Sequence, residues 1–158
     1  MVEYKRLYTK ADVLALIESF SAEFRSLSQR VELAAYAEKL AEHADVIVME
    51  NQNEVIGMAA MYVNDLITKT AYISLIGIRK EHQGTGCGTL LLRHCILEAQ
   101  KAGMEKIRLE VDDSNINARK FYHRHGFVLE RASERNSCFL VRAIGMARAA
   151  DNIKNERI

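Results

Sequence analysis

The sequence contains no proline, and it has no surplus of charge of either sign. Without proline, its turns must be built from glycine, asparagine and aspartate. Lysine and arginine total 22, against 21 aspartate and glutamate residues. The basic residues are also not gathered into a patch with interleaved aromatic side chains. We therefore expect neither a nucleic-acid partner nor a membrane-surface partner.

Cysteine is scarce, and long apolar runs are missing. The three cysteines, Cys87, Cys95 and Cys138, are odd in number and too far apart in the sequence to form a ligand cluster. No apolar run approaches the ~20 residues of a membrane span. The first residues, MVEYKRLYTK, lack the apolar core of a signal peptide. We expect a reduced, cytoplasmic protein without a metal site.

The apolar residues that are present suffice for one core. The 158 residues are 49% hydrophobic, enough for a single domain that folds unaided. We expect this domain to span residues 1–144 and to be followed by a polar C-terminal tail over residues 145–158. No repeat, low-complexity segment or internal linker divides the chain.

Hydrophobic periodicity predicts the order of strands and helices. Strands are expected at Glu3–Tyr8, Val46–Glu50, Glu54–Val63, Ala71–Ile78, Lys106–Val111, Phe127–Ala132 and Cys138–Ile144. Helices are expected from Thr9 to Phe24, over Ser28–His43, over Thr89–Lys101 and from Asn115 to Gly126. This order predicts an α/β fold, a mixed sheet with helices on both faces.

One stretch joins an apolar strand, a glycine-rich loop and a Leu-rich helix without interruption. The loop and the first residue of the helix are Gln83, Gly84, Thr85, Gly86, Cys87, Gly88 and Thr89. Glycines let the backbone approach a ligand closely, and the first N–H groups of a helix have no helical acceptor. The order of elements is therefore typical of phosphate binding.

Three kinds of phosphate-binding loop have glycines like these. A Walker loop needs a lysine after its last glycine, whereas Thr89 and Leu90 follow Gly88. A dinucleotide-binding loop has the spacing G-x-G-x-x-G near the start of a βαβ unit, whereas the spacing here is G-x-G-x-G after antiparallel strands. The remaining interpretation is a loop for the pyrophosphate of coenzyme A.

Two motifs resemble those of the GNAT N-acetyltransferase superfamily. Gln83-x-x-Gly86-x-Gly88 after a strand is similar to its acyl-CoA signature. A second motif of the family is similar to Asn115-x-x-Ala118-x-x-Phe121-Tyr122, which closes with Gly126-Phe127. The resemblance covers roughly residues 46–139. It implies the GNAT fold, a mixed, mostly antiparallel sheet of six to seven strands flanked by about four helices.

The resemblance also implies acetyl-CoA as the acyl donor and assigns residues to it. The loop over Gly84–Thr89 would hold the pyrophosphate, with Gln83 positioning the loop. The backbone groups of Ile76 and Ile78 would pair with the pantetheine arm where their strand splays from its neighbour. Gly77 within this apolar strand predicts a bulge or a close backbone approach, and we take it as the splay point. Asn115 would contact the cofactor, and its residue type also suits a helix cap.

Two side chains are candidates for the chemistry. Tyr122 matches the position of the family's usual general acid, although Ala118, Phe121 and Tyr122 also form a stripe typical of a helix packed on a core. Glu110 lies on the polar face of its strand and resembles the base of ribosomal-protein N-terminal acetyltransferases. A solvated or ion-paired Glu110 is an equally good interpretation.

These features together predict an N-acetyltransferase that moves an acetyl group from acetyl-CoA directly to a primary amine of a small molecule. Protein amino termini or lysines as acceptors remain alternatives, as does a non-catalytic acyl-CoA-binding module. The segment Phe20–His43 is expected to shape the acceptor site, with Tyr36 and Tyr62 as candidates for its lining. Its mixed charges do not define the acceptor. The last strands and the tail, from Cys138 onward, offer a surface for a homodimer.

Overall fold

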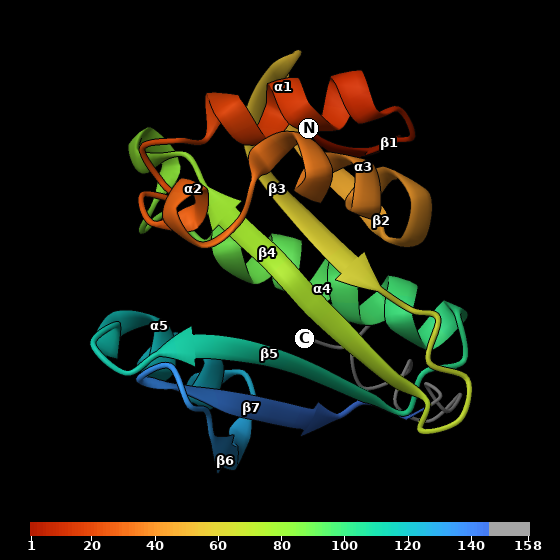
Figure 1. The fold of residues 1–158 in the computed structure, drawn as a ribbon, viewed down its shortest axis with the longest axis vertical. Helices are drawn as coiled ribbons and strands as arrows, with labels where there is room; N and C mark the ends of the chain where they lie inside the picture. Colours follow the sequence, from red (N-terminus) through yellow and green to blue (C-terminus); the bar gives the residue numbers. More distant parts are fainter. Residues whose placement is uncertain (146–158) are drawn as a thin grey trace.

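The computed structural model describes residues 1–145, which form a seven-stranded sheet with helices on both faces (Figure 1). The strands are β1 (Val2–Leu7), β2 (Asp45–Asn51), β3 (Glu54–Tyr62), β4 (Thr70–Ile78), β5 (Lys106–Asp112), β6 (Val128–Ala132) and β7 (Ser137–Ala143). The helices are α1 (Lys10–Ser19), α2 (Leu27–Arg30), α3 (Leu33–His43), α4 (Cys87–Lys101) and α5 (Ile116–Arg124), with one 3₁₀ turn, η1 (Lys80–His82). The expected tail lies outside the described residues except for Gly145.

The sheet is mixed and mostly antiparallel, as the sequence predicted. Its strand order is β1-β2-β3-β4-β5-β7-β6. Only β4 and β5 run parallel, and every other neighbouring pair is antiparallel. No helix among residues 1–145 is long and apolar enough to cross a membrane.

Alternation along the central strands divides the core into two layers. On β2, Val46 and Val48 pack with α1 and α3, whereas Ile47 and Met49 pack with α4 on the opposite face. The face that holds α4 also receives Tyr122 from α5. Both faces of the sheet are therefore buried, which explains why the central strands are nearly continuous apolar runs.

The first two helices differ from the sequence-based expectation. Helix α1 ends at Ser19, so Phe24 lies in the connection to α2 although it follows the helical spacing of α1. The single helix expected over Ser28–His43 is wrong, because the chain is extended at Val31 and starts a new helix. The carboxylate of Glu32 accepts hydrogen bonds from the N–H groups of the first turn of α3 and so caps this second start.

The two central parallel strands pair over only part of their length. The pairs run from Thr70 with Lys106 to Ile73 with Leu109. Beyond Ile73, β4 pairs only with β3, and beyond Leu109, β5 pairs only with β7. Figure 1 shows the two strands diverging from this short paired region. The divergence opens the sheet at its centre.

A bulge lies just beyond the paired region, at Ser74. The register between β3 and β4 shifts there, since Met61 is opposite Ile73 and Ala60 is opposite Leu75. The expected bulge and splay point at Gly77 are therefore wrong: the strands separate four residues earlier, after Ile73, and Gly77 pairs regularly with Met58. One extra residue turns the following side chains over, so that Ile73 and Ile78 face α4 although their spacing is odd.

Candidate active site

A cleft of about 830 Å³ occupies the gap between the diverging strands. Its walls come from β4, β5, α5 with its N-cap, α2 and the connection between α1 and α2. Among the residues that the sequence singled out, it is lined by Ile76, Gly77, Ile78, Gln83, Glu110, Asn115 and Tyr122. The fold therefore brings the two motifs to one site from distant parts of the chain.

The glycine loop continues from the cleft into the first turn of α4. Gly84 and Gly86 have φ of +77° and +86°, a left-handed backbone that favours glycine, and no other atom lies within 4 Å of where a Cβ would be. Helix α4 begins at Cys87, earlier than the expected Thr89. Within the described chain, the backbone N–H groups of residues 84–89 have no acceptor. These consecutive free donors at a helix N-terminus suit an anion.

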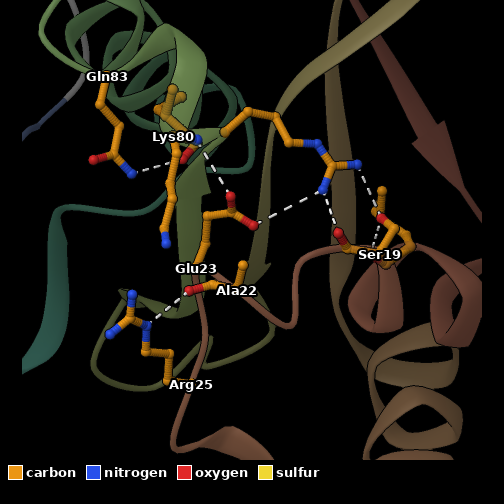
Figure 2. A network of polar contacts seen from close by, with 9 residues as sticks. Ser19, Ala22, Glu23, Arg25, Lys80 and Gln83 are labelled. Atoms are coloured by element: carbon orange, nitrogen blue, oxygen red, sulfur yellow. Dashed lines mark hydrogen bonds and ion pairs between the residues drawn. The ribbon is translucent and has the colours of Figure 1, made fainter.

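One edge of β4 presents its backbone to the cleft. The N–H of Arg79 donates to the carbonyl of Ile56 on β3 at 2.7 Å. Because backbone groups alternate in direction along a strand, Ile76 and Ile78 turn theirs away from β3 and toward the gap. The side-chain amide of Gln83 donates to the carbonyl of Ile78 at 3.0 Å (Figure 2) and so ties the start of the loop to the strand end. The backbone groups of Ile76 remain open.

Tyr122 combines a buried ring with an unpaired hydroxyl. Its ring lies edge-on to Phe121 and Phe127, at centroid distances of 5.2 and 5.5 Å. Burial raises the pKa of the phenol, and nearby Cys95 adds to the rise. No buried polar side-chain atom of residues 1–145 lacks a partner. Since the hydroxyl makes no hydrogen bond to these residues, it must reach the open space of the cleft that Tyr122 lines.

Glu110 reaches the same cleft from the other face of the sheet. On β5, Ile107 and Leu109 pack toward α4, so Arg108 and Glu110 stand on the opposite face. Arg108 is bound by Glu130 through two hydrogen bonds of 2.7 and 3.0 Å. Glu110 has no ion-pair partner in the described part of the chain.

Comparison with known proteins identifies this arrangement. A model of the acetyltransferase (GNAT) family matches residues 13–127. The chain belongs to this family. The expected α/β fold of the family is confirmed, and residues 1–145 hold seven strands and five α-helices where about four helices were expected. No curated protein sequence matches the chain.

Solved structures of other GNAT proteins have the same fold. The ribosomal-protein-S18-alanine N-acetyltransferase from Escherichia coli is 22% identical, with a TM-score of 0.72 over 94% of this chain and 97% of its own. PaiA N-acetyltransferase from Thermoplasma acidophilum, in complex with coenzyme A, is 18% identical, with a TM-score of 0.70 over 90% and 99%. A GNAT family acetyltransferase from Elizabethkingia anophelis with acetyl-CoA bound is 17% identical, with a TM-score of 0.66 over 90% and 97%.

In this GNAT protein, hydrogen bonds and an ion pair join the connection between α1 and α2 to the end of β4. The buried carboxylate of Glu23 lies 3.9 Å from Arg79 and accepts the backbone N–H of Lys80 at 3.2 Å (Figure 2). Arg79 also donates to the carbonyl and the hydroxyl of Ser19 and stacks 3.7 Å from the ring centroid of Phe20. The sequence showed no sign of this network, because its members are ordinary charged residues from separate elements.

A side-chain contact ties the two motifs together. The Thr89 hydroxyl and Nε2 of His125 are 3.1 Å apart, and Nδ1 of His125 is 2.8 Å from the carbonyl of Phe121. Since a carbonyl can only accept, Nδ1 carries the proton of this second bond. Asn115 caps α5 as expected, because its side-chain oxygen accepts the N–H of Ala118 at 3.2 Å. His125 belongs to neither motif that the sequence singled out, so this contact was not predicted.

The acceptor side of the cleft differs from the expectation. Tyr72 and Ser74 line it, whereas Tyr36 and Tyr62 do not. Tyr36 supports it indirectly, since its hydroxyl lies 2.5 Å from that of Ser74. Residues 1–145 contain no group of three or more His, Cys, Asp or Glu side chains placed to hold a metal ion.

Proposed function

We propose that this protein is an N-acetyltransferase that moves an acetyl group from acetyl-CoA directly to a primary amine of a small molecule. The observation that carries the proposal is the row of free N–H groups over residues 84–89, which continues the open edge of β4 into a helix N-terminus. We include a reducing, cytoplasmic setting, because Cys87, Cys95 and Cys138 are all free thiols.

The donor would lie along the gap between β4 and β5. Its pyrophosphate would accept hydrogen bonds from the N–H groups of Gly84 to Thr89, where the dipole of α4 adds roughly half a positive charge. Its pantetheine amides would pair with the open backbone groups of Ile76 and with the N–H of Ile78, as a neighbouring strand would. Gln83 would hold the loop against the strand end through Ile78. Asn115 would contact the donor while capping α5.

Tyr122 would act as the general acid. Amine attack on the thioester expels a thiolate, and a nearby hydroxyl that gives up a proton lowers the barrier to its departure. A phenol is already protonated at neutral pH, and burial raises the pKa of Tyr122 further, so the proton is present when the thiolate forms. The hydroxyl has no competing acceptor among residues 1–145.

Glu110 would help to remove the proton of the amine, directly or through water. At pH 7, deprotonation of an amine with a pKa of about 10.4 costs about 4.6 kcal/mol of free energy, whereas deprotonation of one with a pKa near 7.8 costs about 1 kcal/mol. The unpaired carboxylate of Glu110 therefore matters most for strongly basic acceptors. Tyr122 and Glu110 line the cleft from opposite faces of the sheet, so the proposed acid and base would approach the reacting carbon from different sides.

The deciding experiment measures thiol release from acetyl-CoA with a panel of amines: amino acids, amino sugars, polyamines, aminoglycosides and short peptides with free amino termini. We expect release above the hydrolysis background with at least one small amine, together with its acetylated product by mass spectrometry. A pure acyl-CoA-binding module would bind the donor and release no thiol with any amine. Thermal shifts with coenzyme A, ATP and NAD separate both possibilities from a nucleotide-binding protein.

A further inference from the structure

Some charged side chains of the cleft have hydrogen-bond or ion-pair partners within the protein, and others do not. The Glu23 carboxylate accepts the Lys80 N–H and lies near Arg79. Asp112 accepts the N–H and the hydroxyl of Ser114 at 2.9 and 2.7 Å. Both carboxylates therefore already have hydrogen-bond partners within the protein.

Three other charges of the cleft have no ion-pair partner in residues 1–145, namely Arg25, Arg30 and Glu110. Arg25 donates only through Nε, to the carbonyl of Ala22 at 3.3 Å, which leaves its terminal nitrogens free. Figure 2 shows this side chain turned away from the contacts of Glu23. Glu110 is half-buried and both arginines are exposed, so the negative charge lies inside and the positive charges lie at the rim.

Two of these unpartnered charges, Glu110 and Arg30, act on the same residue of the cleft, Tyr72. Glu110 and Tyr72 stand on the face of the sheet that α1 and α3 cover, and α2 carries Arg30 at its last turn. Burial and then the charge of Glu110 raise the pKa of Tyr72, whereas the Arg30 guanidinium acts in the opposite direction. Both charges therefore lie close to this phenol.

We propose that the acceptor carries an anionic group, a carboxylate or a phosphate, in addition to its amine. Arg30, together with Arg25, binds the anion at the rim, and Glu110 receives the ammonium inside. A guanidinium suits both anions, because its planar fork matches two oxygens at once. A polyamine, which carries only positive charges, would be repelled by the two guanidinium groups at the rim, and the Asp112 carboxylate near Arg30 offsets part of this positive charge. This inference rests on the proposed acetyltransferase function and specifies its substrate class.

Matched acceptors test the proposal without knowledge of the natural substrate. One arm compares the standard L-amino acids with their carboxamides, which keep the amine and lose the carboxylate. The other compares glucosamine 6-phosphate with glucosamine. We expect kcat/KM to be at least about fivefold higher for the anionic member of the preferred pair, the value of one partly exposed charge contact. The arm that responds identifies the anion.

Variants then assign the preference to residues. Arg30→Gln should raise KM for the anionic acceptor about fivefold or more, leave kcat unchanged and leave the uncharged partner unaffected. Arg25→Gln should act in the same direction. Arg93→Gln is the matched control, because Arg93 is an exposed arginine on α4 outside the cleft lining. It should change neither KM nor kcat for either acceptor. The affinity for coenzyme A, measured by calorimetry, should be the same in all of these proteins.

Three outcomes would overturn the inference. Equal use of anionic and uncharged amines contradicts it and leaves the acetyltransferase function intact. A loss of coenzyme A affinity in Arg30→Gln would assign the guanidinium to the donor phosphates. Absence of thiol release with every amine, in a protein that still binds acetyl-CoA, would overturn the proposed function and the inference together.

Discussion

The ring of Phe24 lies directly on the backbone of Gly77. A Cβ on Gly77 would lie 2.6 Å from Cζ of this ring, closer than side chains approach one another. The glycine is thus required for close approach, one of the two alternatives that the sequence left open, and the contact seats the α1–α2 connection on the strand that borders the cleft. Phe24 and Gly77 also both line the cleft.

Substitution of this glycine should be costly only while the ring is present. Gly77→Ala should destabilise the protein by about 1–3 kcal/mol, because the ring and its segment must move. In a Phe24→Leu background, the same change should cost less than half as much. Urea unfolding of the wild type, both single variants and the double variant gives the coupling energy. Additive effects would show that the ring does not respond to the new methyl group.

The glycine loop can be tested with a control of the same backbone conformation. Gly86→Glu should weaken coenzyme A binding by at least about tenfold, since it adds a negative charge beside the proposed pyrophosphate site. Its strain should cost about 1–2 kcal/mol of stability. Gly103→Glu has equally positive φ, +84°, and equally open surroundings at the other end of α4. Gly103→Glu should lose the same stability and bind coenzyme A normally. If both variants bind coenzyme A equally well, the glycine loop is not the pyrophosphate site.

Removal of one oxygen from Tyr122 should separate chemistry from binding. Tyr122→Phe should lower kcat by about 10²-fold while KM for acetyl-CoA stays within about twofold, because the ring keeps its packing and only the proton donor is lost. Steady-state kinetics measures both parameters, and melting curves confirm the fold. Tyr8→Phe, at an exposed tyrosine, is the control. Unchanged turnover would remove Tyr122 from the mechanism.

Stability should fall at alkaline pH because of a buried thiol. Burial, with a smaller contribution from Glu98, raises the pKa of Cys95 from 9.0 to about 12. Below pH 9 the thiol is neutral in both folded and unfolded chains. Above pH 9 mainly the unfolded chain ionises, so stability declines, by about 1.4 kcal/mol between pH 8 and pH 10, until the folded thiol ionises near pH 12.

Denaturant unfolding at pH 8 and pH 10 measures this dependence. Cys95→Ala should reduce the difference in unfolding free energy between the two pH values by about 1.4 kcal/mol relative to the wild type. Cys87→Ala, at a half-buried thiol, should keep the wild-type difference. An identical difference in Cys95→Ala would show that other groups cause the alkaline loss.

Much of the fold was predictable because its signals are local. Continuous or alternating apolar residues between polar turns mark each strand within one or two residues of its bounds. Gly84 and Gly86 predict the loop because their positive φ is a property of the backbone at those positions. The break at Val31 was not predictable, since neither glycine nor proline marks it. Its cap is the carboxylate of Glu32, an uncommon residue at a helix start.

The site was predictable only where a motif carries it. Tyr122 and Asn115 were placed by their spacing, and both line the cleft. The bulge at Ser74 was not predicted, because it depends on how β4 pairs with β3, and the sequence of one strand does not show this pairing. Phe24 was assigned to a helix face because its spacing from Phe20 is helical, although the helix has already ended. Arg30 reaches the cleft only through tertiary packing of α2.

The short pairing of β4 with β5 makes the sheet two plates joined by a narrow hinge of four residue pairs. In the free protein the amides of Ile76 and Ile78 have no strand opposite them, so they should exchange with solvent hydrogen faster than Leu75 and Gly77, which face β3. A donor bound in the gap would supply the missing strand and slow the exchange of those amides. Bound acetyl-CoA would then link the two halves of the sheet as well as react, so that the protein would be more rigid with the donor bound than without it.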